Sequence, residues 1–355
     1  MSGYLGRQRI AVLLATIVAV SATGCDGTPN AKPSMTPSAL LSSSSSGSID
    51  QAAGWETKSP GGDCECADGS RFNFYVRTGD RKKVVLYLDG GGACWSATTC
   101  GKNSGNRYQT TVEPPDKGGI FDAKNTRNPF AGYSFVYVPY CTADVHLGDA
   151  DTTYASGLTI HHHGYANGTA ALAELLKSFP QATDVVVVGG SAGSVSAPVY
   201  AGLVADRLPK AHITSISDSS GSFPDVPQMN KILTGKDWKA KGLPTDASMP
   251  GLFIATAKRH PGIVFARIDH SQDKDQNFHL KLAGAPSDDV AALLRTTEAQ
   301  IDKAGVTLHT YTEPGDGHMV VDNEDFYIQN VDGVPLSAWV AGLIAGKPTV
   351  DVGRG

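Results

Sequence analysis

The sequence lacks an excess of basic residues and has few cysteines, and each shortage excludes a class of function. There are 30 lysines and arginines against 35 aspartates and glutamates, which gives a net charge of −5 and a pI of ≈ 6.0. This balance argues against nucleic acid or an anionic membrane surface as the main partner. The six cysteines lack the paired spacing of zinc sites, so we expect neither a metal nor another cofactor.

Long hydrophobic runs are also missing, apart from one short stretch at residues 10–20 that follows Arg7 and Arg9. This stretch is too short to span a membrane permanently. Together with the small residues before Cys25 it has the pattern of an export signal, so residues 1–24 are predicted to be a signal peptide. Its end resembles a bacterial lipoprotein signal. That resemblance implies lipidation of Cys25 and anchoring to the outer face of the bacterial cell membrane; ordinary secretion is the alternative.

Large apolar residues are scarce again in residues 25–53, which are rich in serine, proline and threonine. Such a segment cannot bury enough surface to offset its ordering entropy, and we expect a disordered tether. Residues 54–350 are then a single catalytic domain. An exported protein can keep disulfides, and Cys94 and Cys100, which flank a short loop, are the best candidate pair.

Apolar strand patterns alternate with helical patterns through the rest of the chain. The alternation predicts an α/β fold with a mostly parallel central sheet and helices on both faces. Ligands bind such sheets beyond the carboxyl ends of the strands. The expected strands lie at residues 72–78, 83–88, 134–140, 184–188, 213–217, 262–268 and 306–311, and the expected helices at 166–179, 194–208, 287–305 and 335–346.

The stretch "VVVVGGSAGSVSAP" leaves a strand through a tight corner with Ser191 at its apex. Gly189, Ser191 and Gly193 fit the G-x-S-x-G pattern, and a strand before it and a helix after it are the context that gives this pattern meaning. The corner predicts a serine nucleophile, with a structural turn or a phosphate-binding loop as alternatives. The sequence lacks the Lys-Ser/Thr ending of a phosphate-binding P-loop.

A nucleophilic serine needs a base and an orienting acid, which follow it in the order acid, then histidine, in α/β-hydrolases. His318 lies on a glycine-bounded loop after a late strand and is the expected base. His260, His270 and His279 are further candidates, whereas His309 fits a packed strand position. The run His161-His162-His163 alternates faces if extended, so we expect part of a wall rather than a metal cluster. For the acid, the residues leave four candidates open: Asp269, Asp273, Asp275 and, from a different loop, Asp218.

An oxyanion hole is expected where an early strand meets a glycine-rich loop, because glycines let backbone N–H groups approach a developing negative charge. The stretch "VVLYLDGGGACW" supplies Gly90, Gly91 and Gly92 directly after a strand. A plain glycine turn is the alternative.

Taken together, these segments resemble the pectin acetylesterase and Notum family of serine carboxylesterases. The matching pieces include "LYLDGGGACW", "FVYVPYCTADVHLGD", "VVVVGGSAGS", "ISDSSG", "DKDQ" and "PGDGHMVVDNEDFY", in the family's order over roughly residues 62–348. The resemblance implies Ser191 as nucleophile, His318 as base and Asp273, in an Asp-x-x-Gln segment, as acid. It also implies oxyanion donors at Gly91, Gly92 and Ala192, the disulfides Cys94–Cys100 and Cys66–Cys141, and an odd Cys64.

The sequence is therefore interpreted as an exported serine esterase that removes small, acetyl-like groups from an acylated carbohydrate or similar alcohol. Gly92 stands where Notum-type members carry an aromatic residue, which argues against a long acyl group. The alternatives are a non-catalytic surface protein that binds carbohydrate or lipid on the same scaffold, and a lipase or peptidase. The membrane is a partner only through the lipid anchor.

Overall fold

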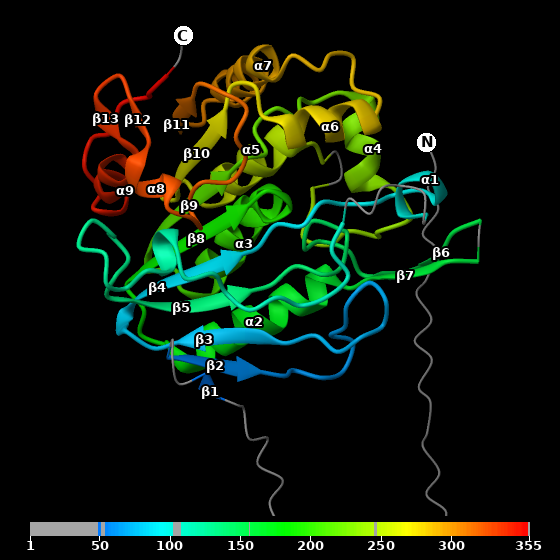
Figure 1. Cartoon of the computed structure of the whole chain (residues 1–355), viewed down its shortest axis with the longest axis horizontal. Coiled ribbons are helices and arrows are strands. Elements are labelled where there is room, and N and C mark those ends of the chain that lie inside the picture. Colours follow the sequence, from blue (N-terminus) through cyan, green and yellow to red (C-terminus); the bar gives the residue numbers. More distant parts are fainter. Residues whose placement is uncertain (1–48, 51–53, 102–107, 156, 245–246, 354–355) are drawn as a thin grey trace, which may run out of the picture. The chain divides into compact units, whose positions relative to one another are not determined.

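A nine-stranded sheet lies at the centre of the fold, in the order β1-β2-β3-β5-β4-β8-β9-β10-β11 (Figure 1). The computed structural model describes residues 49–50, 54–101, 108–155, 157–244 and 247–353. Strands β5 to β11 of this order run parallel, and β1, β2 and β3 pair antiparallel at one edge. The strands are β1 (Ile49–Asp50), β2 (Trp55–Lys58), β3 (Phe74–Arg77), β4 (Asp80–Leu88), β5 (Tyr133–Val138), β8 (Asp184–Gly190), β9 (His212–Asp218), β10 (Val264–His270) and β11 (Leu308–Glu313).

Helices cover both faces of the sheet because both faces of its central strands are apolar. In β4, Val84 and Leu86 pack into one core cluster, whereas Val85 and Tyr87 pack into another on the opposite face. The first face is covered by α2 (Gly164–Ser178), α3 (Ala192–Arg207), α5 (Met249–Arg259) and α7 (Val290–Lys303). The second is covered by the 3-10 turn η1 (Gly119–Phe121), α8 (Asp325–Ile328) and α9 (Leu336–Ile344). The predicted α/β class, with a mostly parallel sheet between helices, is confirmed.

Shorter elements occupy the connections between the larger strands and helices. They are α1 (Ala97–Cys100), the hairpin of β6 (Ala150–Thr153) and β7 (Thr159–His162), α4 (Pro227–Thr234), α6 (Lys274–Leu282) and the ribbon of β12 (Asn330–Val331) and β13 (Val334–Pro335). Two disulfides, Cys94–Cys100 and Cys66–Cys141, join segments in the first half of the chain. They are the two pairs that the sequence and the family resemblance imply.

The described residues all fall within one compact unit. The predicted signal peptide, Cys25 and the predicted tether up to residue 48 lie outside the described residues. Within the described ranges, no helix is long and apolar enough to cross a membrane.

Candidate active site

Ser191 occupies the corner between β8 and α3 in a strained backbone conformation. Its φ of 46° and ψ of −113° lie in a region that residues other than glycine rarely adopt. The corner is possible only because its neighbours lack side chains: a Cβ on Gly189 would clash with the Gly193 carbonyl, and a Cβ on Gly193 with that of Leu88. The turn therefore exposes the Ser191 hydroxyl above the carboxyl end of the sheet.

The His318 imidazole contacts the Ser191 hydroxyl from the loop that follows β11. Its Nε2 lies 2.9 Å from Ser191 Oγ, and its Nδ1 lies 2.7 Å from Asp273 Oδ2. A carboxylate can only accept here, so Nδ1 carries a proton and the neutral ring presents the Nε2 lone pair to the serine. Burial alone would lower the pKa of His318, but the hydrogen bond and negative charge of Asp273 outweigh it and raise this pKa.

Asp273 is fully buried, and five hydrogen bonds besides its contact with His318 hold it in place, one of them from Asn277 N–H to its backbone carbonyl at 3.0 Å. It caps the N-terminus of α6: its Oδ1 accepts from the backbone N–H groups of Asp275 and Gln276, each at 2.9 Å. The Gln276 side chain donates to Oδ2 at 3.0 Å, and the Asp273 backbone N–H donates to the His270 carbonyl at 3.4 Å. The Asp-x-x-Gln pattern thus corresponds to a carboxylate oriented by its own glutamine.

The other three acid candidates have different surroundings, although an Asp275 carboxylate oxygen lies within 4.8 Å of a ring nitrogen of His318. Asp269 is buried against Arg267, with 2.7 Å between Oδ2 and Nε. Asp218 binds backbone N–H groups of the His318 loop. Asp275 faces the open cavities beside Ser191. Of these carboxylates, the structure brings Asp273 into hydrogen-bond contact with His318.

Most of the other candidate histidines make contacts away from Ser191. His260 pairs with Asp206, and His270 with the buried Glu313 at 3.2 Å. His279 lies on α6 and lines the cavities beside Ser191, and His309 lies in β11, as expected. In the run of three, the expected alternation holds: His162 is buried, whereas His161 and His163 meet Asp151 on the opposite side.

The three expected oxyanion donors border Ser191. Ala192 begins α3, so its backbone N–H has no acceptor within the helix. Gly92 has a φ of 74°, which favours glycine, and it lines the space on both sides of Ser191. A Cβ on Gly91 would meet the Tyr140 ring at 2.6 Å, so this loop packs tightly behind the site.

Two pockets, one largely apolar and one rich in carboxyl groups, meet at Ser191 and His318. The first is a cavity of ≈ 60 Å³ whose walls include Trp95, Phe223 and Trp238. The family resemblance implies walls formed by residues 93–95 and 218–223, and the lining includes Ala93, Trp95, Ser219, Ser220 and Phe223 from these two segments. The second is an open cleft of ≈ 850 Å³ with five carboxyl side chains and one lysine in its lining: Asp89, Glu113, Asp116, Asp275, Asp322 and Lys117.

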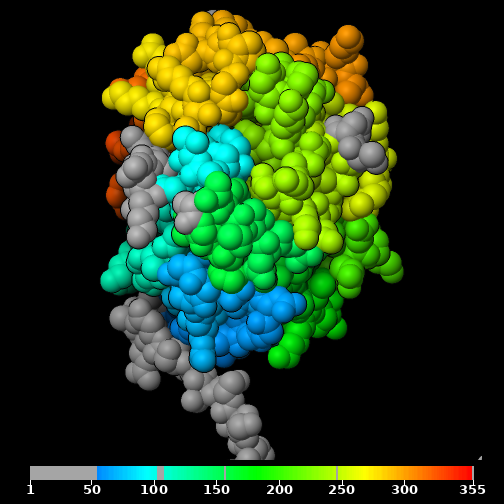
Figure 2. Space-filling view, turned by 90° about the vertical axis from the view of Figure 1, so that its right-hand side faces the viewer, coloured from blue at the N-terminus to red at the C-terminus, as the bar shows by residue number. Residues whose placement is uncertain are grey.

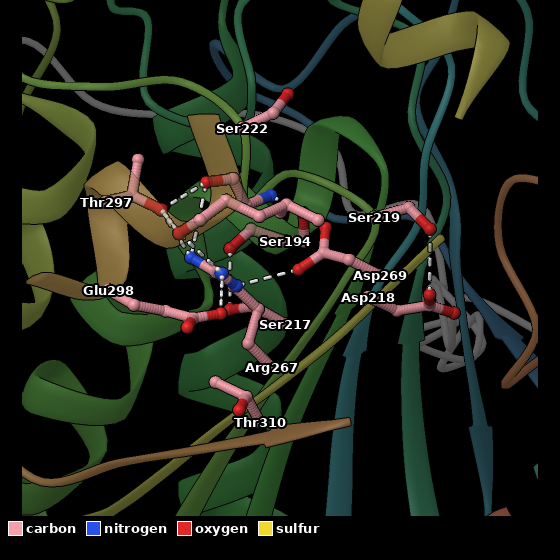
Figure 3. Close-up of polar contacts among 12 residues, drawn as sticks. Ser194, Ser217, Asp218, Ser219, Ser222, Arg267, Asp269, Thr297, Glu298 and Thr310 are labelled. Atoms are coloured by element: carbon pink, nitrogen blue, oxygen red, sulfur yellow. Dashed lines mark hydrogen bonds and ion pairs between the residues drawn. The ribbon is translucent and has the colours of Figure 1, made fainter. Parts of the chain in front are cut away.

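A buried polar network below the site was not predicted from the sequence. Figure 3 shows Arg267 reaching Asp269, Thr297 and Glu298, with hydrogen bonds of 2.8 Å to the last two. Asp269 in turn accepts from Gly221 N–H at 2.8 Å and from the Gln276 side chain at 2.9 Å. Because Gln276 also binds Asp273, this network braces the acid of the Ser191–His318–Asp273 chain. The only signal in the sequence was a charged pair, Arg267 and Asp269, inside an otherwise apolar strand.

Comparison with known proteins identifies the family. The Pectinacetylesterase family profile matches residues 57–238, which is 182 of the 355 residues. The chain is 32% identical over 141 residues to "Palmitoleoyl-protein carboxylesterase notum2" of Xenopus laevis, covering 36% of this chain and 27% of that protein. It is 25% identical over 176 residues to "Pectin acetylesterase 5" of Arabidopsis thaliana, covering 46% and 40%. It is also 32% identical over 110 residues to "Inactive palmitoleoyl-protein carboxylesterase notum1b" of Danio rerio, covering 29% and 76%.

The first two of these matches span less than half of the relative's length. The profile match contains Ser191 and the glycines of the β4 loop but ends before Asp273 and His318, whose proximity to Ser191 comes from the geometry. On the matched residues, which make up just over half of the sequence, the chain belongs to the pectinacetylesterase family.

Proposed function

We propose that this protein is a serine hydrolase of carboxylic esters, with Ser191 as nucleophile, His318 as base and Asp273 as orienting acid. The observation that supports this most is the unbroken hydrogen-bond chain from Ser191 Oγ through both imidazole nitrogens to Asp273, at 2.9 and 2.7 Å. A serine hydroxyl is a weak nucleophile until a positioned base takes its proton, and this chain supplies that base.

The reaction proceeds through an acyl-enzyme. Ser191 Oγ attacks the ester carbonyl while its proton passes to His318 Nε2, and the oxyanion accepts hydrogen bonds from the N–H groups of Gly91, Gly92 and Ala192. The tetrahedral intermediate collapses as His318 returns the proton to the leaving alcohol. A water molecule then attacks the acyl group by the same route and regenerates Ser191.

The acyl group of the substrate is proposed to be small. The ≈ 60 Å³ cavity next to Ser191 is lined by bulky side chains, among them Trp95, Phe223, Trp238, Ile232 and Met249. Trp238 is fully buried and its indole N–H donates to the Cys94 carbonyl at 2.8 Å, so it is fixed in position. An acetyl group fits such a cavity, whereas a long acyl chain requires these walls to move.

The alcohol part of the substrate is proposed to be a neutral or cationic carbohydrate or similar alcohol. It would lie in the ≈ 850 Å³ cleft, where the described lining residues include five carboxyl groups and one lysine. Glu113 and Asp116 are exposed at its rim. A cleft of one charge sign attracts ligands of the other sign and repels those of its own. A polyuronate with a carboxylate on each sugar is therefore disfavoured.

We further propose that the enzyme acts outside the cytosol. The two disulfides fit an oxidising compartment. The sequence pattern before Cys25 supports lipid anchoring at the outer face of the cell membrane, with secretion as the alternative.

A fluorophosphonate probe, which reacts with activated serines, tests this function. We expect one adduct per chain, located on Ser191 by peptide mass spectrometry, and loss of p-nitrophenyl acetate hydrolysis in step with labelling. Ser191→Ala should remove both, whereas Ser287→Ala, at an exposed serine, should change neither. Absence of labelling and hydrolysis in the folded protein would favour a non-catalytic binding protein. Cleavage of long-chain esters or peptides in place of short esters would favour a lipase or peptidase.

A further inference from the structure

Four metal-ligating side chains converge at the β6–β7 hairpin, outside the Ser191 site. Asp151 of β6 lies opposite His161 of β7 in the hairpin register. His163 is the N-cap residue of α2, and Glu65 comes from the segment that bridges to Arg71. Figure 2 shows this face, where the green surface of the hairpin borders the blue surface of the N-terminal segment. We propose that the protein binds a structural Zn²⁺ ion here through Glu65, Asp151, His161 and His163.

The distances between the ligand atoms suit a tetrahedral ion. One ligand atom from each of the four residues lies within 4.8 Å of all the others. His161 Nδ1 lies 2.7 Å from Asp151 Oδ1 and 3.1 Å from Glu65 Oε1, and His163 Nε2 lies 3.1 Å from Asp151 Oδ1. Zinc bonds of about 2.0–2.1 Å in a tetrahedron place neighbouring ligands about 3.3 Å apart. Small side-chain adjustments are therefore enough to surround an ion.

The tautomer of His163 gives a second reason to expect a cation. His163 Nδ1 lies 2.7 Å from the Asp63 carbonyl oxygen, which can only accept, so Nδ1 carries a hydrogen. In the neutral ring the Nε2 lone pair then faces the Asp151 carboxylate, so two acceptors meet unless the ring takes a second proton. A bound cation satisfies both acceptors in the place of that proton. Metal-bound histidines commonly donate their other N–H to a carbonyl in this way.

The donor set selects the kind of metal. Two imidazoles and two carboxylates suit zinc, whereas calcium and magnesium prefer oxygen ligands throughout. Four protein ligands fill a tetrahedral site, which is typical of structural rather than catalytic zinc. This proposal revises the expectation of no metal: the histidine run supplies two ligands on one face, and Asp151 and Glu65 supply the others from separate segments.

The other ligand clusters in the described residues do not compete as metal sites. Cys94 and Cys100, which lie near His162, are joined in a disulfide. Asp273 and His318, with Asp275, belong to the hydrogen-bond chain of Ser191. An ion at the hairpin would link the segment of Cys66 to the start of α2.

Metal titration of the full chain, purified without a polyhistidine tag, tests the proposal. After chelation and removal of the chelator, we expect one Zn²⁺ to bind per chain by calorimetry. At a free Zn²⁺ concentration of about a hundred times Kd, Tm should rise by about 5 °C. Co²⁺ in its place should give the intense visible absorption of a tetrahedral complex.

Variants then locate the ion. Asp151→Asn and His161→Gln should each weaken Zn²⁺ binding by more than about tenfold, by analogy with the losses seen when the surroundings of a metal are altered, and should abolish the tetrahedral Co²⁺ spectrum. His260→Gln, in a comparable surface histidine–aspartate pair, and Cys64→Ser, at the free thiol next to Glu65, should bind as the unaltered chain does. If the unaltered chain binds no Zn²⁺, or if binding survives in both cluster variants, the proposal is wrong. Ester hydrolysis is not the readout, so a failed esterase proposal would leave this result unaffected.

Discussion

Asp218 Oδ2 accepts a 2.9 Å hydrogen bond from the backbone N–H of Val320, two residues after His318. The same oxygen accepts from Val321 N–H at 3.0 Å, and the Asp218 side chain is fully buried. The loop that carries His318 is thus fastened to the carboxyl end of β9, the strand next to the one that leads to Ser191. Asp218, which the sequence analysis considered as a candidate acid, therefore holds the His318 loop in position.

Removing this attachment should slow catalysis without touching the reacting atoms. Asp218→Ala leaves two buried N–H groups unpaired, each at a cost of about 1–3 kcal/mol, so we expect a lower Tm and a kcat reduced about tenfold or more with little change in KM. Asp218→Asn should restore most of both, because its amide oxygen can accept the same two bonds. Steady-state kinetics and thermal unfolding measure this. If Asp218→Asn were as inactive as Asp273→Asn, the two hydrogen bonds to the loop would not explain what Asp218 does.

Asp273→Asn should reduce kcat/KM by about 10⁴-fold, because an amide cannot hold the imidazole in the productive tautomer. Asp269→Asn should have a smaller effect on the rate and a larger one on Tm, since it removes the buried partner of Arg267. Short-ester kinetics on both variants, beside their unfolding curves, separate the two effects. A greater loss of rate in Asp269→Asn would show that the Asp-x-x-Gln pattern misidentifies the acid.

The pH profile should follow the state of His318, which must be neutral to accept the serine proton. The pKa of His318 is raised by Asp273 against the effect of burial, so kcat/KM should fall as the pH drops through a value above the ordinary imidazole pKa of about 6.5. Asp275 contributes a weaker charge effect on the same pKa. Asp275→Asn should therefore move the acidic limb slightly to lower pH. An unchanged profile in this variant, or a limb shifted to higher pH, would contradict the assignment.

Acyl-chain length should affect the rate steeply. We expect faster hydrolysis of acetyl and butyryl esters than of esters beyond about eight carbons, because each methylene that finds no room forfeits roughly 0.8 kcal/mol of burial. Phe223→Ala should shift the optimum towards longer chains by enlarging the ≈ 60 Å³ cavity that this ring lines. The measurement is kcat/KM over a nitrophenyl ester series. A maximum of kcat/KM at long acyl chains in the unaltered enzyme would contradict the proposal that the acyl group is small.

The charge of the leaving alcohol should matter as well. At low ionic strength, kcat/KM should be about tenfold higher for the acetate ester of a cationic alcohol than for that of a matched anionic alcohol. Added salt should reduce this ratio of the two kcat/KM values. Burial, opposed by bonds from Tyr137 and Gly90, raises the pKa of Asp89 to about 7, so the ratio should grow between pH 6 and 8.

Substitutions in the cleft provide the control for this charge effect. Glu113→Gln combined with Asp116→Asn should reduce the preference for the cationic ester. Asp288→Asn, at an exposed carboxylate paired with Lys281, should leave it unchanged. Equal rates for both esters, or a preference for the anionic one, would mean that the cleft does not select by charge.

The sequence predicted the parallel strands and helices α2, α3, α7 and α9 well because their apolar residues recur at the spacing that burial requires. The run at residues 184–188, for example, lies in β8. The helix expected at 287–305 is observed as α7, at Val290–Lys303. The antiparallel strands were harder to predict: β2 and the separate β6–β7 hairpin are short and partly polar. Helices α4, α5 and α6 were also missed. In α6, which begins after the cap residue Asp273, apolar residues are too few to form a helical pattern.

The functional residues also differ in how far the sequence alone identifies them. Ser191 could be found from local sequence, because its corner needs glycines at fixed positions. The choice of Asp273 needed either a family pattern or coordinates, since Asp269 and Asp275 lie in the same stretch and only side-chain direction separates them. The cluster of Glu65 and Asp151 with two histidines could not be read from spacing, because three separate segments meet there.

The free Cys64 lies two residues from the bridged Cys66. Thiol–disulfide exchange begins with attack by a thiolate, so a neighbouring thiol could shuffle the bond to Cys141. Burial, reinforced by the charge of Asp63, raises the pKa of Cys64 to about 11. At neutral pH this sulfur stays protonated and is a poor attacking group. Cys64 is therefore a weak nucleophile, and the protein can carry this unpaired thiol beside the Cys66–Cys141 disulfide without exchange between them.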